Sequence, residues 1–251
     1  MSGEKKVAVV VLAAGMGTRM KSEKAKVLHE IAGKTMISYV LETALGVTSS
    51  ENIVVVVGCQ AEAVRDEARR KGNVAFAHQD RQLGTGHAVR CAMDSLPDKA
   101  QDVVILCGDV PFISEGTIKA LIKKKRDENL DVCLLAVKLD SPTGYGRIIF
   151  DQYDRVVRIV EESDASSGEK TLNVVNAGTY CVDKDFLAWS LTQINPDNRQ
   201  KELYLTDIVG IASKTNKLAG ALILQNGNEV IGVNSKEDLE RAARALGQKS
   251  G

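Results

Sequence analysis

The chain has no excess charge of either sign. Lysine and arginine together number 33, aspartate and glutamate together also number 33, and the formal net charge is +0 with histidine neutral. Proteins that hold nucleic acid or an anionic membrane without specific contacts need a basic field. The sequence therefore predicts no nucleic-acid partner and no membrane partner, and an anionic ligand must be bound locally by particular side chains.

The sequence also lacks paired cysteines and long apolar runs. Its five cysteines are odd in number and widely spaced, and no Cys-x-x-Cys pair indicates a zinc or redox site. No apolar run approaches the ~20 residues of a membrane-spanning helix. The cysteines are Cys59, Cys91, Cys107, Cys133 and Cys181. We interpret them as reduced core residues.

The N-terminus resembles a secretory signal only in part. Lys5 and Lys6 precede the apolar run Val7 to Ala14, but glycines and cations follow at once and no small-residue cleavage site of the usual form is present. The run therefore predicts a buried strand. Together with the cysteine pattern, it predicts a cytoplasmic protein.

Internal repeats, low-complexity tracts and linkers are absent. A chain of 251 residues with 44% apolar residues is long enough to bury a substantial core. We expect a single domain over residues 1–251, with a core at 5–235 and a C-terminal helix and tail at 236–251. The oligomeric state stays open.

Short β-branched runs alternate with amphipathic stretches through the first half of the chain. The strands are expected at Val7 to Val11, Ile53 to Val57, Val74 to Ala77 and Val103 to Cys107, and helices between them at Met36 to Leu45 and Ala61 to Lys71. This alternation is typical of βαβ units around a parallel sheet. The runs are apolar at consecutive positions, which indicates burial on both faces. We predict an α/β fold with a doubly wound, mainly parallel sheet flanked by helices.

The second half is less regular. Strands are expected at Val132 to Val137, Arg147 to Phe150, Val156 to Val160, Val174 to Cys181 and Val230 to Val233. Helices are expected at Lys184 to Thr192, at Thr206 to Ser213 with Thr206 as N-cap, and at Lys236 to Leu246.

A glycine-rich turn, Leu12-Ala13-Ala14-Gly15-Met16-Gly17-Thr18-Arg19-Met20, follows the first strand. At the carboxyl end of a parallel strand, such a turn lets backbone N–H groups approach a phosphate. The Walker A pattern does not fit, and a dinucleotide fingerprint needs a third glycine where Met20 stands, so NAD binding is disfavoured. The alternative is a turn that serves only to reverse the chain.

Two cations accompany this turn. Arg19 can fork across two phosphate oxygens, whereas Lys26 is a compact point charge on a flexible stem. Together they suit a triphosphate. The alternative for Lys26 is a solvated member of the run Lys21, Lys24 and Lys26.

The segment Gln79 to His87 follows the third strand and opens a helix at Thr85. A glutamine amide both donates and accepts, which matches a pyrimidine edge, and glycines such as Gly84 let a flat base lie against the backbone. We predict base recognition here, and a structural role for His87.

Asp109 stands just past the end of the fourth strand, in Gly108-Asp109-Val110-Pro111. A carboxylate beside a phosphate loop is suited to hold Mg²⁺ whose other ligands are phosphate oxygens and water. Asp109 is therefore the candidate metal ligand. The alternative is a loop aspartate that caps the next helix.

Taken together, these motifs resemble those of the sugar-phosphate nucleotidyltransferases, and among them the pyrophosphorylase domain of N-acetylglucosamine-1-phosphate uridyltransferases. The resemblance covers Val7 to Glu240. Its more specific strings are Gln82-Leu83-Gly84-Thr85-Gly86-His87, Pro142-Thr143-Gly144-Tyr145-Gly146-Arg147, Tyr204-Leu205-Thr206-Asp207 and Gly232-Val233-Asn234. It implies the Rossmann-like fold of nucleotide-diphospho-sugar transferases.

The resemblance also implies roles for individual residues. Arg19, Lys26 and Asp109 would be catalytic, and Asp109 with Asn234 would hold Mg²⁺. The nucleotide would contact Leu12, Ala13, Ala14, Gly15, Gln79, Gly84 and Thr85, with further substrate contacts from Gly17, Cys107 and Gly108. The sugar 1-phosphate would contact Gly146, Glu161, Asn176, Tyr204 and Thr206.

The reaction implied is attack of the sugar-phosphate oxygen of N-acetylglucosamine 1-phosphate on the α-phosphorus of UTP, in line with departing pyrophosphate. Another sugar 1-phosphate or nucleotide, or a non-catalytic nucleotide-sensing relative, stays open as an alternative. No hexapeptide-repeat acetyltransferase domain is expected. The chain departs from the family pattern at Ala25, where proline is common, at Ser163, where many members have lysine, and at Cys107, often a larger residue.

Overall fold

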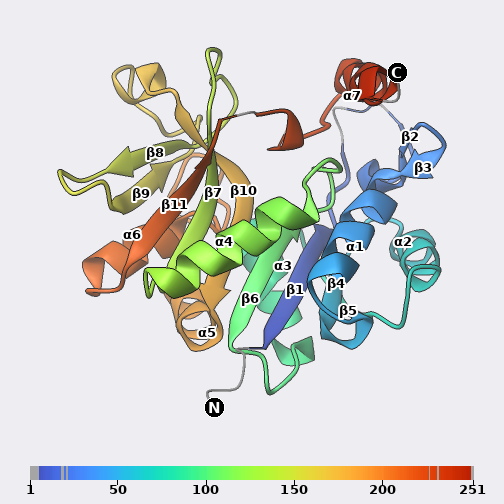
Figure 1. The fold of residues 1–251 in the computed structure, drawn as a ribbon, viewed down its shortest axis with the longest axis horizontal. Helices are drawn as coiled ribbons and strands as arrows, with labels where there is room; N and C mark the ends of the chain where they lie inside the picture. The colour runs from blue at the N-terminus through green and yellow to red at the C-terminus, as the bar shows by residue number, and fades with distance from the viewer. Residues whose placement is uncertain (1–5, 18–19, 21, 226, 231, 250–251) are drawn as a thin grey trace.

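Figure 1 shows the computed structural model of the chain, which describes residues 6–17, 20, 22–225, 227–230 and 232–249. The strands are β1 (Val7–Ala13), β2 (Glu30–Ile31), β3 (Lys34–Thr35), β4 (Ile53–Val57), β5 (Ala75–His78), β6 (Asp102–Cys107), β7 (Val132–Lys138), β8 (Arg147–Phe150), β9 (Val156–Val160), β10 (Val174–Asp183) and β11 (Ala219–Leu224). The α-helices are α1 (Met36–Val47), α2 (Ala61–Arg69), α3 (Thr85–Ala92), α4 (Glu115–Asp127), α5 (Lys184–Gln193), α6 (Asp207–Lys214) and α7 (Lys236–Lys249).

One large sheet organises the fold. Its main strand order is β11-β7-β10-β6-β1-β4-β5, and the hairpin β8–β9 joins it through β10. Strands β6, β1, β4 and β5 pair in parallel, as do β11 and β7, while β10 runs antiparallel between β6 and β7. The predicted doubly wound, mainly parallel sheet is confirmed.

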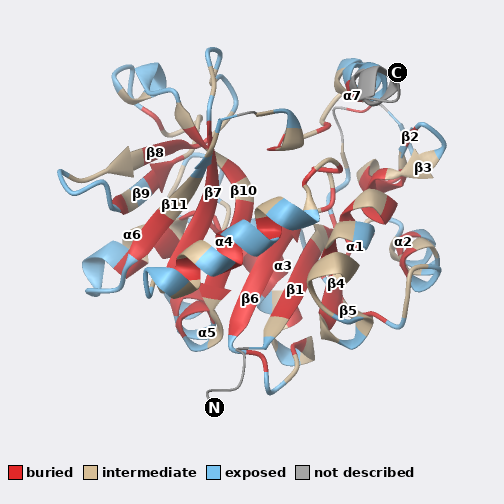
Figure 2. Cartoon of the chain, in the orientation of Figure 1, coloured by how far each residue is buried: buried red, intermediate tan, exposed pale blue. Residues whose placement is uncertain are grey.

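Each face of the sheet buries its own hydrophobic cluster. Along β1, Val9 and Val11 belong to the cluster that includes residues of α1 and α4, whereas Ala8 and Val10 belong to the cluster that includes residues of α3 and α5. This alternation follows from the two-residue period of a strand. Figure 2 shows the central strands as buried and the outward face of α4 as exposed. Helices on both faces thus explain the continuous apolar runs.

One expected strand is absent from the described residues. The segment expected as a strand at Val230 to Val233 instead holds the end of a 3-10 helix (Gly227–Val230), followed by residues without regular secondary structure, and Ile231 lies outside the described residues. Val230 and Val233 are buried at 3% and 0% exposure, so their apolar character serves packing rather than strand pairing. Thr206 occupies the N-cap position of α6 as predicted, but its hydroxyl donates to Glu161 and makes no cap bond to the helix.

Strand β11 was not expected from the sequence, and helix α4 was given no bounds there. Gly220 lies within β11, where a Cβ would come within 2.6 Å of the Leu130 side chain, so close packing requires a residue of low strand propensity. Helix α4 begins at the N-cap Ser114, whose hydroxyl accepts a bond from the Thr117 N–H. Within the described residues, no helix is long and apolar enough to cross a membrane.

A buried ion cluster ties α4 to the start of β6. Asp102 is 0% exposed and accepts from the Lys125 ammonium at 2.7 Å and from Arg126 Nε at 3.1 Å. The Lys125 side chain is 3% exposed. Such a cluster contributes little net stability, but removal of one partner leaves the other charge buried and unpaired.

We therefore predict that Asp102→Asn lowers the free energy of unfolding by about 3 kcal/mol. Urea denaturation followed by circular dichroism measures this change. Glu115→Gln is the matched control, because the Glu115–Lys119 pair is exposed on α4 and its loss should change stability by less than about 1 kcal/mol. Equal effects of the two substitutions would contradict the prediction.

Candidate active site

A cleft of about 390 Å³ opens beyond the carboxyl ends of β1, β5 and β6. It is the position at which open α/β sheets bind ligands. The sequence-predicted residues that line it are Leu12, Ala14, Gly15, Gly17, Lys26, Gln79, Gly84, Thr85, Cys107, Asp109 and Asn234. Ala13 and Gly108 do not line it, and Arg19 lies outside the described residues.

Lys26 is the centre of the polar contacts in this cleft. Its ammonium donates to Asp109 Oδ2 in a short ion pair and to Asn234 Oδ1 at 2.6 Å. The side chains of Lys26 and Asp109 are 12% and 26% exposed, so the pair is partly shielded from water. Three residues from distant parts of the sequence thus meet at one point.

Two glycines permit this arrangement. Gly17 has φ +66°, and a Cβ there would lie 2.6 Å from the Lys26 Cβ. A Cβ at Gly108 would lie 2.9 Å from both the Leu12 carbonyl oxygen and the Val27 side chain. The glycine loop after β1 and the turn after β6 therefore pack directly around the Lys26 segment, which larger residues would displace.

Asn234 is placed by the start of α7. The Asp238 carboxylate accepts from the N–H groups of Asn234 and Ser235, and the Ser235 hydroxyl accepts from the Asp238 N–H. This reciprocal arrangement is a capping box. The Val233 N–H also donates to the Asp109 carbonyl oxygen at 2.9 Å, so Asn234 and Asp109 are tied together through the backbone.

The donor set suits a hard divalent cation. Asp109 and Asn234 offer a carboxylate oxygen and an amide oxygen, and both meet the same positive group, the Lys26 ammonium. Mg²⁺ prefers oxygen ligands and keeps several waters or phosphate oxygens in its shell. Within the described residues, no group of three or more histidine, cysteine, aspartate or glutamate side chains could hold a metal by itself. These two residues fit a metal that the substrate helps to bind.

Gln79 has a fixed orientation at the opposite side of the cleft. Its amide nitrogen lies 3.1 Å from the Gly84 carbonyl oxygen and 3.1 Å from His87 Nδ1, and the side chain is nearly buried. With Nδ1 as the acceptor, His87 carries its proton on Nε2, which lies 3.8 Å from Cys91 Sγ. His87 therefore positions Gln79, in agreement with the structural role predicted for it.

The loop before α3 is joined to the segment before α6. The Leu203 N–H donates to the Leu83 carbonyl oxygen at 2.7 Å, and the Gly86 N–H donates to the Leu203 carbonyl oxygen at 2.8 Å. Thr85 Oγ1 accepts from the Leu205 N–H at 3.0 Å. Gly84 adopts φ +108°, and a Cβ there would lie 2.6 Å from the Leu203 carbonyl oxygen. A side chain at position 84 would break this junction.

Four of the five residues expected at the sugar phosphate form a second cluster next to the cleft. Thr206 Oγ1 donates to Glu161 Oε1 at 3.0 Å, and the Asn176 N–H donates to the Gly146 carbonyl oxygen at 2.9 Å. A Cβ at Gly146 would lie 3.3 Å from Glu161 Oε2, so glycine leaves that carboxylate uncovered on this side.

A bulge in β10 connects this second cluster to the cleft. The Asn176 amide donates to the Tyr180 hydroxyl at 2.7 Å and accepts from the Gly178 N–H at 3.1 Å, where the pairing register with β7 shifts. Cys107 Sγ lies 3.3 Å from the Gly178 carbonyl oxygen. Burial, followed by the charge of Asp109, raises the pKa of the Cys107 thiol to about 12, so the thiol stays protonated and can donate this bond.

Tyr204 contacts the loop after β9. Its hydroxyl donates to Gln200 Oε1 at 2.9 Å and lies 3.4 Å from Ser163 Oγ, and the Ser163 hydroxyl donates to Asp164 at 2.9 Å. These contacts hold the loop after β9. The structure therefore brings Tyr204 to this loop and not to the cleft lining.

Several cleft residues were missed by the sequence analysis: Met16, Val27, Gln82, Ala88 and Glu202. Gln82 donates from Nε2 to the Ala14 carbonyl oxygen at 2.6 Å and so bridges the glycine loop to the loop before α3. Its place in the Gln-Leu-Gly-Thr-Gly-His string was an available signal. Glu202 offered none, because its position depends on the backbone junction at Leu203.

Comparison with known proteins identifies the family. A family model described as a MobA-like NTP transferase domain matches residues 9–171. The chain is 44% identical over 240 residues to "Bifunctional protein GlmU" of Pelobacter propionicus, covering 96% of this chain and 52% of that protein. It is 43% identical over 246 residues to the protein of the same name from Desulfotalea psychrophila, covering 98% of this chain and 72% of that protein.

The chain belongs to the family of MobA-like NTP transferase domains, and the resemblance noted in the sequence is confirmed. It spans about half the length, 52%, of the Pelobacter relative. Among solved structures, a UDP-glucose pyrophosphorylase complexed with UDP-glucose matches with a TM-score of 0.77 at 18% identity, covering 98% of this chain and 100% of that chain. At this identity the match supports the fold alone.

The pKa of the Glu161 carboxyl is shifted by its surroundings, and this shift can be tested. Burial raises its pKa above the usual value for glutamate, and the bond donated by Thr206 lowers it in part. A carboxyl whose pKa is raised by folding contributes stability below the unfolded-state pKa, and this stability is lost as the pH rises through the folded-state pKa.

We predict that Thr206→Val raises the pKa of Glu161 further and makes the protein lose stability more steeply as the pH rises through that pKa. Carbon-13 NMR titration of the glutamate carboxyl groups measures the pKa, with Glu161→Gln assigning the signal. Thr192→Val is the control, because the Thr192 hydroxyl bonds the Trp189 carbonyl oxygen and the neighbouring Gln193 amide at an exposed position, and neither partner is Glu161. An unchanged or lower pKa in Thr206→Val would show that the hydroxyl does not act on Glu161.

Proposed function

We propose that this chain is a nucleotidyltransferase that converts UTP and N-acetylglucosamine 1-phosphate to UDP-N-acetylglucosamine and pyrophosphate. The observation that carries the proposal is the meeting of Lys26, Asp109 and Asn234 at one point in a cleft beyond the sheet. Similarity to curated proteins named GlmU over 96% of the chain supports it.

The chemistry needs positioning and charge neutralisation rather than a side-chain nucleophile. Both substrates are polyanions, and in-line attack on the α-phosphorus brings their phosphates together. Lys26 supplies a positive charge, and the glycine loop supplies backbone N–H groups beside it. Asp109 and Asn234 would hold Mg²⁺, which neutralises phosphate charge when it is bound.

The orientation of Gln79 supports preference for uracil. Because its amide nitrogen is engaged by Gly84 and His87, the carbonyl oxygen is the atom suited to a base. Uracil presents an N–H at its N3 position, which donates to such an oxygen, whereas cytosine has an unprotonated acceptor nitrogen there. We infer that UTP is selected over CTP by this contact.

The second cluster would hold the sugar 1-phosphate. Glu161 is held by Thr206 and left uncovered by Gly146, and its carboxylate is suited to accept from sugar hydroxyl groups. Asn176 lies beside it, although both ends of its amide are engaged by Tyr180 and Gly178. It would reach a sugar only by exchanging one of these bonds.

Pyrophosphate release from the four common ribonucleoside triphosphates, each combined with several sugar 1-phosphates, tests the proposed function. The expected result is fastest release with UTP and N-acetylglucosamine 1-phosphate. Equal or faster release with a purine nucleotide would refute the base assignment, and a faster rate with another sugar would refute the sugar assignment. Absence of release with every pair would refute the activity.

Asp109→Asn retains the shape of the side chain and removes its charge. We predict that it lowers kcat at least ~100-fold, or roughly 2.7 kcal/mol of transition-state stabilisation, while the fold persists. Asn234→Ala should act in the same direction but less severely, because water can replace a neutral ligand.

Steady-state kinetics over a wide range of Mg²⁺ concentration measures both effects. Asp154→Asn is the matched control, since this aspartate lies in the exposed turn between β8 and β9 and its left-handed φ of 59° suits asparagine. Near-normal turnover of Asp109→Asn at low Mg²⁺ is the outcome that contradicts the metal assignment.

A further inference from the structure

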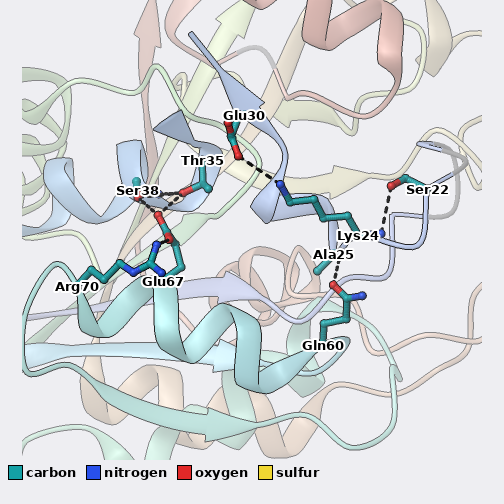
Figure 3. Close-up of polar contacts among 9 residues, drawn as sticks. All are labelled: Ser22, Lys24, Ala25, Glu30, Thr35, Ser38, Gln60, Glu67 and Arg70. Atoms are coloured by element: carbon teal, nitrogen blue, oxygen red, sulfur yellow. Dashed lines mark hydrogen bonds and ion pairs between the residues drawn. The ribbon is translucent and has the colours of Figure 1, made fainter. Parts of the chain in front are cut away.

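Gln60 has an unusual backbone conformation and an unusual set of partners. It precedes α2 in the left-handed region, with φ 49° and ψ 45°, yet its side chain makes no cap bond to that helix. Outside glycine, such a conformation costs of order 1 kcal/mol or more and persists only where the surroundings enforce it. Its side chain instead reaches the loop that precedes Lys26 (Figure 3).

Both ends of the Gln60 amide bond the same stretch of backbone. Oε1 accepts from the Ala25 N–H at 2.9 Å, and Nε2 donates to the Glu23 carbonyl oxygen at 2.7 Å. The amide thus pairs with the loop much as a neighbouring strand would, through one donor and one acceptor two residues apart. A side chain that only covered the surface would not need both contacts.

The bonded N–H belongs to the residue directly before Lys26. Ala25 is 0% exposed, so an unpaired N–H there would carry a desolvation cost. Lys26 then opens a short 3-10 helix (Lys26–Leu28), and its ammonium meets Asp109 and Asn234. A shift of the backbone at Ala25 would therefore move the base of the Lys26 side chain.

Ala25 packs in the hydrophobic core, but the other polar contacts described for the loop residues before it are weaker. The Lys24 ammonium lies 3.4 Å from Glu30, and both side chains are about half exposed, at 45% and 53%. An exposed pair of this kind contributes about 0–1 kcal/mol. The Ser22 hydroxyl accepts from the Lys24 N–H within the loop itself and does not link it to another element.

Helix α2 gives Gln60 a firm base. Glu67, farther along the same helix, accepts from the Thr35 and Ser38 hydroxyl groups at 2.9 and 2.7 Å, at the start of α1 (Figure 3). These bonds, that of Ser38 first, lower the pKa of the Glu67 carboxyl, so it stays ionised and bonded at neutral pH. The helix that presents Gln60 is therefore itself anchored.

We propose that Gln60 is a positioning residue whose side-chain amide holds the backbone of Glu23 and Ala25 and thereby delivers Lys26 to the active site. The assignment rests on the proposed nucleotidyltransferase function for its effect on catalysis. The loop contact itself does not depend on that function.

Ala25 permits a direct test by double substitution. Its φ of −52° and ψ of 137° lie within the range that proline adopts, but proline has no N–H to donate to Gln60. Proline at position 25 and the Gln60 amide are therefore alternative ways to restrain the same backbone. Combined in one chain, they interfere, because proline leaves the Gln60 oxygen without its partner.

Gln60→Ala should lower kcat/KM for UTP about five- to tenfold, the effect of about one hydrogen bond, and leave KM for the sugar phosphate within twofold. Ala25→Pro should also lower kcat/KM for UTP. The double variant Gln60→Ala, Ala25→Pro should have a higher kcat/KM for UTP than either single variant, because proline then restrains the backbone without leaving the Gln60 oxygen unpaired. If Gln60 had a purely structural role, its loss would change the kinetic constants for UTP and for the sugar phosphate together. Adding Ala25→Pro would then not raise kcat/KM for UTP above that of the single variants.

Hydrogen exchange of the Ala25 N–H, followed by nitrogen-15 NMR, tests the contact without any activity. Exchange should be at least ~10-fold faster in Gln60→Ala, while exchange of α4 amides is unchanged. Asn129→Ala is the matched control, since Asn129 also has a left-handed φ, 51°, but lies far from this loop in the sequence. It should leave both exchange at Ala25 and kinetics unchanged.

The outcomes separate the two proposals. If the unaltered chain releases no pyrophosphate, the proposed function fails, and unchanged Ala25 exchange in Gln60→Ala would independently overturn the loop contact. If the unaltered chain is active and Gln60→Ala matches it in kcat/KM for UTP, the positioning role is overturned. The positioning role is also overturned if kcat/KM for UTP of the double variant is no higher than that of both single variants.

Discussion

The contact of the Lys26 ammonium with Asp109 and Asn234 is the interaction on which the site depends. Asp109 lies 83 positions after Lys26 in the sequence, and Asn234 lies 208 positions after it. The Lys26 ammonium neutralises the Asp109 carboxylate, which is partly buried and would be costly to leave unpaired, and it also donates to the Asn234 amide oxygen. The glycines that admit the Lys26 segment, the capping box before α7 and the backbone bond from Val233 to Asp109 all serve to bring these three side chains to one point.

The same principle of assembly before ligand binding extends through the cleft. Gln79 is oriented by His87 and Gly84, and Glu161 is held by Thr206. The backbone junction at Leu203 connects the loop that contains Gly84 to the segment that contains Thr206. Preformed polar groups of this kind need little reorganisation when charge develops in a reaction. The proposed nucleotide and sugar subsites are thus parts of one connected network.

Local patterns predict the parallel strands well, since burial on both faces leaves continuous β-branched runs, as at Ile53 to Val57. They also place the glycine turn and Asp109 at strand ends, where the topology brings them together. The edge strand β11 was missed because it contains Gly220. The apolar run at Val230 to Val233 was predicted to be a strand, but Val230 and Val233 are buried without pairing to the sheet. Side-chain partners are set by tertiary contacts. The bond from Thr206 to Glu161 and the role of Gln60, 35 residues from Ala25, therefore had no local signal.

Binding of Mn²⁺ in the absence of nucleotide, measured by electron paramagnetic resonance, tests the central contact most directly. If Asp109 and Asn234 hold the metal as proposed, the Lys26 ammonium would compete with a divalent cation for the same two oxygens. Lys26→Met is similar in size and neutral, so we predict at least ~10-fold tighter Mn²⁺ binding, lost again when Asp109→Asn is added. Equal or weaker binding by Lys26→Met would contradict the view that Lys26 stands where the cation binds.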